Sequence, residues 1–224
     1  MTANNQQDGR HYINEFYTLR EEVLNSLTHG VGTILAIAAL ITLIVLGITR
    51  GTGWHVAAYS IYGVTLILLF LASTVYHTVQ HTPLRPVFRR IDHAAIYIFI
   101  AGSYTPFALI GLRGPLGWTL LVIIWGLAIA GILFKIWFIN RWVVLSTLAY
   151  VGMGWLGVIA FPKLIHILPT YGTVLLIAGG VIYTLGVIFY ALERLPYNHA
   201  IWHVFILAAS ACHFVAILSL LNVL

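Results

Sequence analysis

Charged side chains are scarce in this sequence, and cysteine is nearly absent. Only 8% of the 224 residues are charged, whereas 61% are hydrophobic. Because a soluble domain carries roughly 25% charged residues, the composition excludes an ordinary soluble domain and predicts an integral membrane protein. The single cysteine, Cys212, has no partner for an internal disulfide, and a cysteine-based zinc site is excluded.

Seven apolar stretches are each long enough to cross a bilayer as a helix, which takes about 20 residues. Short separators that contain glycine or proline divide them, so neighbouring helices are expected to pack antiparallel. The predicted fold class is therefore an all-α integral membrane protein, a bundle of seven transmembrane helices. The predicted spans are 27–48, 54–79, 93–112, 116–138, 142–161, 169–192 and 199–221.

The first 26 residues are polar and hold four of the six acidic residues. No signal peptide is apparent among them, so the first apolar stretch is expected to direct insertion. Tyr12, Phe16 and Leu19 repeat at helical spacing, which predicts a short amphipathic helix at the membrane surface, with a frayed polar tail as the alternative. We therefore divide the chain into an N-terminal segment, 1–26, and a transmembrane domain, 27–224.

Lysine and arginine are distributed unevenly between the two sides of the predicted membrane. Eight of the 11 lie in the N-terminal region and the second, fourth and sixth loops, and three lie on the other side. The positive-inside rule therefore predicts a cytoplasmic N-terminus and a C-terminus outside. The net charge of +5 mostly expresses this asymmetry. Because the basic residues form no stripe, no nucleic-acid partner is expected.

Three short polar motifs lie at ends of the apolar stretches: Ser73-Thr-Val-Tyr-His77, Asp92-His93 and His199-Ala-Ile-Trp-His203. With the N-terminus inside, all three lie near the cytoplasmic side. His199 and His203 are four residues apart, so they share one helix face about 6 Å apart along the axis. Together with His77 they supply three imidazoles, which suits a zinc site that leaves a fourth position for water.

Asp92 and Ser73 complete the predicted site. Asp92 is placed to orient or deprotonate a water, and Ser73, one turn before His77, to hydrogen-bond that water or a substrate oxygen. An ionisable residue inside a membrane is costly, and its default interpretation is functional. Glu22 and His29, at the cytoplasmic end of the first span, are candidates for residues that contact the ligands without binding the ion themselves.

Each of these residues also has a structural explanation when taken alone. The pair His199 and His203 lies near a helix end, where a wet interface accommodates histidine. Asp92 can begin the third helix or pair with a neighbouring arginine, and the Ser73 hydroxyl can bond to a carbonyl one turn earlier. Their joint placement at one depth favours a metal site over these separate explanations.

Other histidines bear on the choice of ligands. His81 is also four residues from His77 and is the rival ligand, although it lies nearer the loop. His213 follows His203 by ten residues, about 15 Å along the helix axis, so it is too distant for the same ion and is expected to pack or to form a hydrogen bond. His93 is left outside the ligand set.

The motifs together resemble the bacterial hemolysin III branch of the progestin and adiponectin receptor (PAQR) family, which is similar in turn to the alkaline ceramidases. The resemblance covers nearly the whole chain, from about Glu21 onward. Its combination of motifs is specific, although each motif alone is not. The motifs are Glu21-Glu-Val-Leu-Asn-Ser-Leu-Thr-His-Gly30, Ser73-x3-His77, Arg90-Ile-Asp-His93, Ala101-Gly-Ser-Tyr-Thr-Pro106 and His199-x3-His203.

The resemblance implies a zinc ion held by His77, His199 and His203, with Asp92 and Ser73 contacting the zinc-bound water. It also implies a multi-pass protein of the bacterial inner (cytoplasmic) membrane, with the metal site near the cytoplasmic side. We therefore predict a ceramidase-like, zinc-dependent hydrolase of a lipid amide or ester, with that water as nucleophile and a membrane lipid as substrate. The alternative is a zinc-containing receptor or regulator of the membrane lipid state without turnover.

A hemolysin-type pore is the least favoured alternative, because the predicted spans carry no polar stripe through the bilayer. Glycine is frequent within the spans, with 20 glycines in the chain. Small residues allow membrane helices to approach closely. Such faces suit both packing inside the bundle and a homo-oligomer.

Overall fold

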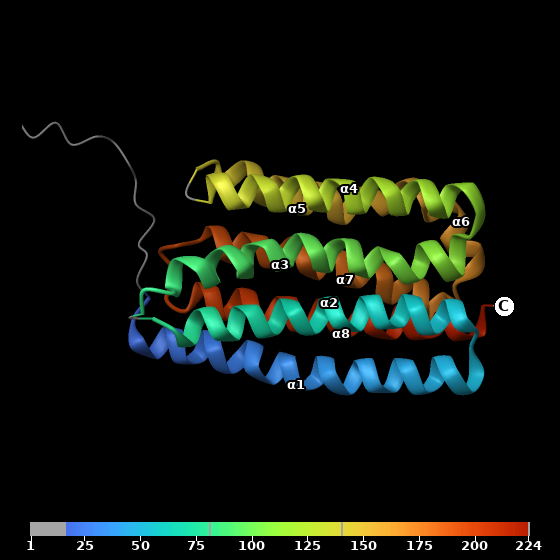
Figure 1. Cartoon of the computed structure of the whole chain (residues 1–224), viewed down its shortest axis with the longest axis horizontal. Helices are drawn as coiled ribbons and strands as arrows, with labels where there is room; N and C mark the ends of the chain where they lie inside the picture. The colour runs from blue at the N-terminus through green and yellow to red at the C-terminus, as the bar shows by residue number, and fades with distance from the viewer. Residues whose placement is uncertain (1–16, 81, 140, 224) are drawn as a thin grey trace, which may run out of the picture.

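The computed structural model describes residues 17–80, 82–139 and 141–223, and the regular structure in these ranges is helical. Seven helical stretches are long and apolar enough to cross a membrane, which confirms the predicted bundle. Figure 1 shows them running along the long axis in layers, from α1 through α2 and α8, then α3 and α7, to α4 and α5. The α-helices are α1 (Leu19–Arg50), α2 (Gly53–Thr78), α3 (Arg85–Pro106), α4 (Gly114–Phe138), α5 (Val143–Trp155), α6 (Phe161–Ile167), α7 (Thr170–Ala191) and α8 (Asn198–Leu218).

Helix α1 begins at Leu19, well before the predicted start of the first span, because of a capping box. The Glu21 N–H donates to the Thr18 hydroxyl oxygen at 3.3 Å, and the Thr18 N–H donates to the Glu21 carboxylate at 2.9 Å. This exchange satisfies two backbone donors that a helix start leaves unpaired. Of the predicted amphipathic helix, the part before residue 17 lies outside the described residues, and Leu19 to Val23 form the first turn of α1.

Three of the spans depart from regular α-helix, the last of them only in a final 3-10 turn over Ser219–Asn222. After Pro106, α3 continues as a π-helix over Phe107–Leu112, at the place where proline, which has no N–H, interrupts the hydrogen-bond ladder. The fifth span changes to a 3-10 turn over Leu156–Ala160 before it continues as α6. The Tyr104 hydroxyl of α3 accepts a hydrogen bond from the Gly157 N–H at 2.8 Å, which holds this break against α3.

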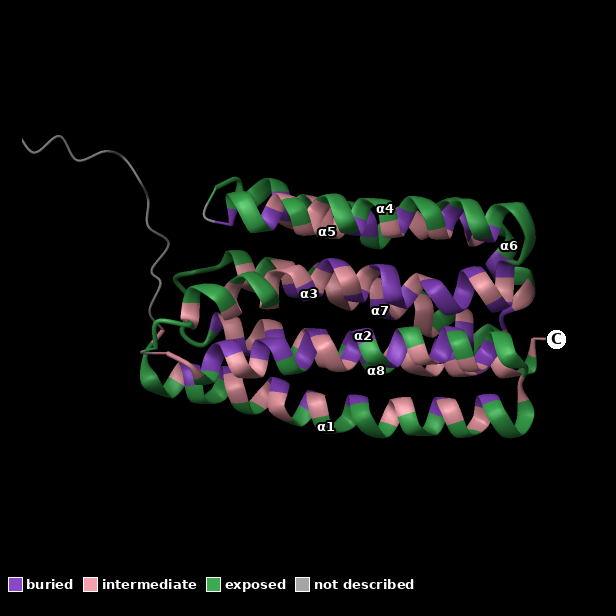
Figure 2. Ribbon diagram, viewed as in Figure 1, coloured by how far each residue is buried: buried purple, intermediate pink, exposed green. Residues whose placement is uncertain are grey.

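The centre of the bundle is packed with aromatic side chains of α2, among them Tyr59, Tyr62 and Phe70, all at most 1% exposed. Glycine permits the closest approach between α2 and α3, because a Cβ at Gly102 would overlap the Thr65 side chain. The outward faces of the helices remain exposed, as Figure 2 shows. Their exposed side chains include many large apolar ones, as expected for helices that contact lipid.

Candidate metal centre

The three predicted ligands lie together at the end of the bundle where α1 begins. His77 comes from the last turn of α2, and His199 and His203 come from the first turns of α8. One nitrogen of each lies within 4.8 Å of the other two, and the ring centroids are 4.6 to 5.2 Å apart. These three residues, called the histidine cluster below, are therefore close enough to hold a metal ion.

Glu22 of α1 forms a hydrogen bond with the Nδ1 atom of His77. Its carboxylate accepts from the His77 Nδ1 at 2.6 Å and from the Arg85 guanidinium at 2.7 Å, and the Glu22 side chain is fully buried. Because an ionised carboxylate only accepts, the His77 proton lies on Nδ1 and the lone pair on Nε2. That Nε2 is buried without a hydrogen-bond partner in the described chain, which is the condition expected of a metal-ligating nitrogen.

His203 is oriented in the same way by α1. Its Nδ1 lies 3.1 Å from the backbone carbonyl oxygen of Asn25 and 3.1 Å from the Thr28 hydroxyl. A carbonyl oxygen can only accept, so Nδ1 carries the proton and the lone pair of the neutral ring is on Nε2. The Nδ1 atoms of His77 and His203 are thus both engaged by α1.

Tyr17, just before α1, engages the third ligand. Its hydroxyl lies 3.1 Å from the His199 Nδ1, and the two ring centroids are 5.1 Å apart. Burial raises the pKa of the Tyr17 phenol above its ordinary value, so the hydroxyl stays protonated at neutral pH. The contact engages the Nδ1 atom of His199 and leaves the Nε2 atom available to an ion.

A hydrogen bond between a side chain and the backbone also joins the start of α1 to the start of α8. The Glu21 carboxylate accepts a hydrogen bond from the Tyr197 N–H at 3.1 Å. Tyr197 has a φ of 58°, in the left-handed region that non-glycine residues rarely adopt. Such strain persists only where the surroundings fix it. Here it precedes the helix turn that carries His199.

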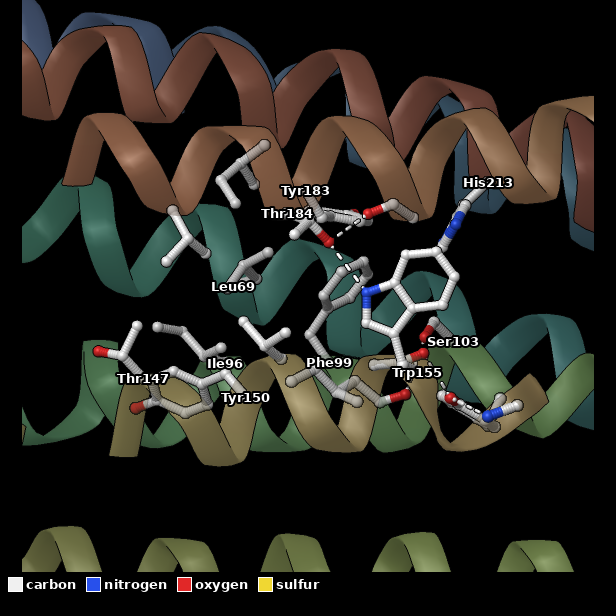
Figure 3. A pocket seen from close by; sticks show the side chains of 18 of the residues that line it. Leu69, Ile96, Phe99, Ser103, Thr147, Tyr150, Trp155, Tyr183, Thr184 and His213 are labelled. Carbon is white, nitrogen blue, oxygen red and sulfur yellow. Dashed lines mark hydrogen bonds between the residues drawn. The ribbon is translucent and has the colours of Figure 1, made fainter. Parts of the chain in front are cut away.

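Asp92 and Ser73 line a cavity of about 400 Å³ that also reaches His199 and His203. The side chains of Ser73 and Asp92 lie next to each other on its wall. Figure 3 shows other residues of the cavity wall, with Tyr150 toward one side and His213 toward the other. The structure therefore places both predicted catalytic residues on the same cavity as two of the three histidines.

The remaining histidines take other positions. His29 stacks on His203 with ring centroids 3.5 Å apart and planes 11° apart, and both its nitrogens lack partners within the described residues. The His93 carbonyl accepts from the Tyr150 hydroxyl at 3.0 Å. His213 is bonded through Nε2 to the Leu176 carbonyl at 3.2 Å, which confirms its expected hydrogen bond. His81, the rival ligand, lies outside the described residues.

Sequence reasoning did not identify Tyr17, Asn25, Thr28 and Arg85 as members of the site. A partial signal was present, because Glu22, Asn25 and His29 recur at spacings of three and four and so share one face of α1. Asn25 acts through its backbone carbonyl, which no residue type indicates. The contact of Arg85 depends on the path of the α2–α3 loop, and sequence spacing does not specify such a path.

Comparisons with known proteins agree with the motifs. The family model described as Haemolysin-III related matches residues 17–214. The chain is 52% identical to Hemolysin-3 of Bacillus cereus over 89% of this chain and 91% of that protein. It is 46% identical to the Hemolysin-3 homolog of Bacillus subtilis over 90% and 95%, respectively.

A more distant similarity reaches a human protein. The chain is 32% identical to the monocyte to macrophage differentiation factor of Homo sapiens, over 89% of this chain and 84% of that protein. No solved structure matches the chain. The resemblance to the hemolysin III branch that the motifs suggested is thereby confirmed.

Proposed function

Since this chain belongs to the Haemolysin-III related family, we propose that its histidine cluster holds zinc and that it hydrolyses an amide or ester bond of a membrane lipid. One observation carries the proposal. Three imidazoles whose Nδ1 atoms are engaged by the protein lie close enough to hold one ion, and two of them, His199 and His203, line the same largely apolar cavity as Asp92. Such a cavity, with a few polar groups at one end, is typical of a site for an apolar ligand.

The donor set favours zinc among the divalent metals. Imidazole nitrogen suits zinc, and three protein ligands with one open position are typical of catalytic zinc sites. The orphaned His77 Nε2 fits this role, because a buried polar atom without a partner is costly unless something binds it. When bound, zinc lowers the pKa of a coordinated water to about 7 and polarises a carbonyl oxygen.

Asp92 transfers the proton of the attacking water, and Ser73 orients the Asp92 carboxylate. The Asp92 carboxylate accepts a proton as the water oxygen bonds to the lipid carbonyl carbon, and Ser73 fixes the direction of the carboxylate. Asp92 then returns the proton to the departing amine or alcohol as the C–N or C–O bond breaks. The products are a fatty acid and the protonated leaving group, so atoms and charges balance.

The cavity supplies a place for the lipid chain. Its volume of about 400 Å³ lies within the range of small-ligand sites, about 300 to 1,000 Å³. Trp155 of α5 forms part of the wall and is 42% exposed. Its indole N–H donates to the Thr184 hydroxyl of α7 at 3.0 Å, and Thr184 also lines the cavity.

The distribution of basic residues supports a location in the bacterial inner membrane with the N-terminus in the cytoplasm. Eight of the 11 lysine and arginine residues flank the side where α1 begins. The histidine cluster lies at this same end, so the proposed reaction takes place near the cytoplasmic surface.

A metal-dependent regulator of the membrane lipid state without turnover is the second candidate. Tyr17 favours it, because its ring lies against His199 and His77 and covers the histidine cluster from the N-terminal side. The name of the human relative also refers to differentiation rather than to a reaction. The names of the bacterial relatives refer to lysis of cells, but a pore has no support in a cavity whose walls are mainly apolar.

The test combines metal content with turnover. The purified protein should contain about one zinc per chain, and His77→Ala and His203→Ala should lose it. Asp92→Asn should retain zinc but lose hydrolysis of fluorescent lipid amides and esters that the wild type cleaves. Zinc without turnover of any such lipid would support the regulator, and equal turnover by the wild type and Asp92→Asn would overturn the proposed mechanism.

A further inference from the structure

The cavity extends well beyond the histidine cluster, and its far end is not purely apolar. It is lined at one end by Asp92 and His203 and, further along α8, by His213. Because ten residues separate the two histidines, His213 lies about 15 Å from His203 along the helix axis. Figure 3 shows His213, Trp155 and Ser103 on one side of the view and Thr147 and Tyr150 on the other.

The hydrogen bond of His213 decides which of its nitrogens is free. Its Nε2 lies 3.2 Å from the Leu176 carbonyl oxygen, which can only accept, so Nε2 carries the proton. In the neutral ring Nδ1 is then a hydrogen-bond acceptor. Gly179 leaves room for the ring, because any Cβ there would overlap it, and Tyr183 packs against it edge to face with centroids 5.3 Å apart.

The other polar side chains at this end are already paired. The Tyr183 and Ser210 hydroxyls lie 2.7 Å apart, the Trp155 N–H donates to Thr184, and the Ser103 hydroxyl donates to a backbone carbonyl at 2.8 Å. The Nδ1 of His213, by contrast, makes no hydrogen bond among the described residues. A strong acceptor in apolar surroundings is costly unless a donor reaches it.

We propose that the far end of the cavity binds a hydroxyl group on the lipid chain, through a hydrogen bond from that hydroxyl to the Nδ1 of His213. The inference rests on the proposed function for the other end of the lipid, whose reacting carbonyl lies beside Asp92. A hydroxyl fits because it donates without bringing a charge into the membrane interior, where charge is costly.

The depth of His213 indicates where on the chain this hydroxyl lies. The hydrocarbon core of a bilayer is about 30 Å thick, so about 15 Å is half of it. A chain whose carbonyl is at the histidine cluster therefore reaches His213 with its middle or distal part. The predicted ligand class is a fatty acyl chain with a hydroxyl at or beyond mid-chain, rather than next to the carbonyl.

Binding of three fatty acids tests this, with the purified full-length protein and a displaceable fluorescent fatty acid. The wild type is expected to bind stearate hydroxylated at mid-chain about three- to tenfold more tightly than stearate, the range of one net hydrogen bond. Stearate hydroxylated next to the carboxyl group is expected to show no such gain. Equal binding of the mid-chain isomer and stearate would overturn the proposal without any mutation.

Two histidine variants locate the effect. His213→Phe keeps a ring of similar size but removes the acceptor, so it is expected to bind the mid-chain isomer and stearate alike. His166→Phe is the matched control, because His166 is exposed on α6 and does not line the cavity, and it is expected to keep the preference. A preference that persists in His213→Phe would refute the assignment.

The binding assay is independent of turnover, so the two proposals fail separately. Asp92→Asn is expected to lose hydrolysis and to keep the preference for the mid-chain hydroxyl. A wild type that prefers this isomer but cleaves no lipid would support the hydroxyl site and overturn the hydrolase. A wild type that cleaves lipids but binds both fatty acids alike would do the reverse.

Discussion

Replacing Glu22 by glutamine should weaken metal binding while leaving the helices intact. In the wild type one carboxylate oxygen accepts from the His77 Nδ1 at 2.6 Å and the other accepts from Arg85 at 2.7 Å. Glutamine has nearly the same shape but only one oxygen that accepts. Its amide N–H groups must therefore face either Arg85 or the Nδ1 of His77.

The consequence for the metal follows from the tautomer of His77. If the glutamine oxygen stays with Arg85, its N–H groups face Nδ1, which then becomes the acceptor and moves the ring proton to Nε2. A protonated Nε2 cannot bind metal. Loss of such a supporting carboxylate typically reduces metal affinity about 10- to 100-fold, which corresponds to about 1.4 to 2.7 kcal/mol.

Zinc affinity measured against a competing chelator in detergent, with circular dichroism to check the helices, tests this prediction. Glu21→Gln is the matched control. The two residues are adjacent and identical, but Glu21 caps α1 and contacts Tyr197 rather than a ligand. Glutamine keeps only one of these two contacts, but neither is to a ligand, so Glu21→Gln is expected to lose much less zinc affinity than Glu22→Gln. Unchanged affinity in Glu22→Gln, or an equal loss in both variants, would refute the reasoning.

The other expected outcomes concern the third ligand, helix packing and the ion itself. Tyr17→Phe removes a neutral hydrogen bond to His199 and should weaken zinc binding about three- to tenfold, less than Glu22→Gln does. A larger loss of zinc affinity in Tyr17→Phe than in Glu22→Gln would contradict this prediction. Gly102→Ala forces a Cβ against Thr65 and should cost about 1 to 3 kcal/mol in thermal denaturation. Gly126→Ala, which meets nothing within 4 Å, should cost nothing, and equal melting temperatures in these two variants would count against the packing. Chelation should lower the melting temperature and added zinc should restore it, because a ligand at roughly 100 times its Kd adds about 2.7 kcal/mol; an unchanged melting temperature would show that the ion does not bridge α2 and α8.

The seven spans could be predicted because the requirement for about 20 apolar residues is nearly independent of tertiary contacts. The structure differs from the predicted spans where capping or contacts with another helix determine the backbone. The start of α1 at Leu19 depends on the capping box, which a hydropathy pattern does not include. The break over Leu156–Ala160 is held by the Tyr104 hydroxyl of another helix, so its position could not be inferred from the fifth span alone.

The histidine cluster could be predicted because spacing places His199 and His203 on one face and the topology places His77 at the same depth. The groups behind these ligands were only partly accessible to the same reasoning. Glu22 was a candidate because it lies at the cytoplasmic end of the first span, but its pairing with His77 rather than another group is a tertiary contact. Tyr17 lies outside the apolar pattern, and nothing in its local sequence indicates its contact with His199.

The histidine cluster draws its parts from opposite ends of the chain. His77 and its partner Glu22 belong to the first two helices, whereas His199 and His203 belong to the last. During synthesis the first hairpin therefore emerges with a one-ligand half-site, and tight metal binding must wait until α8 has been made and has docked. If the cluster holds an ion as proposed, metal content measures completed assembly: a chain that stalls or misfolds before its final helix remains metal-free, however well its earlier helices are inserted.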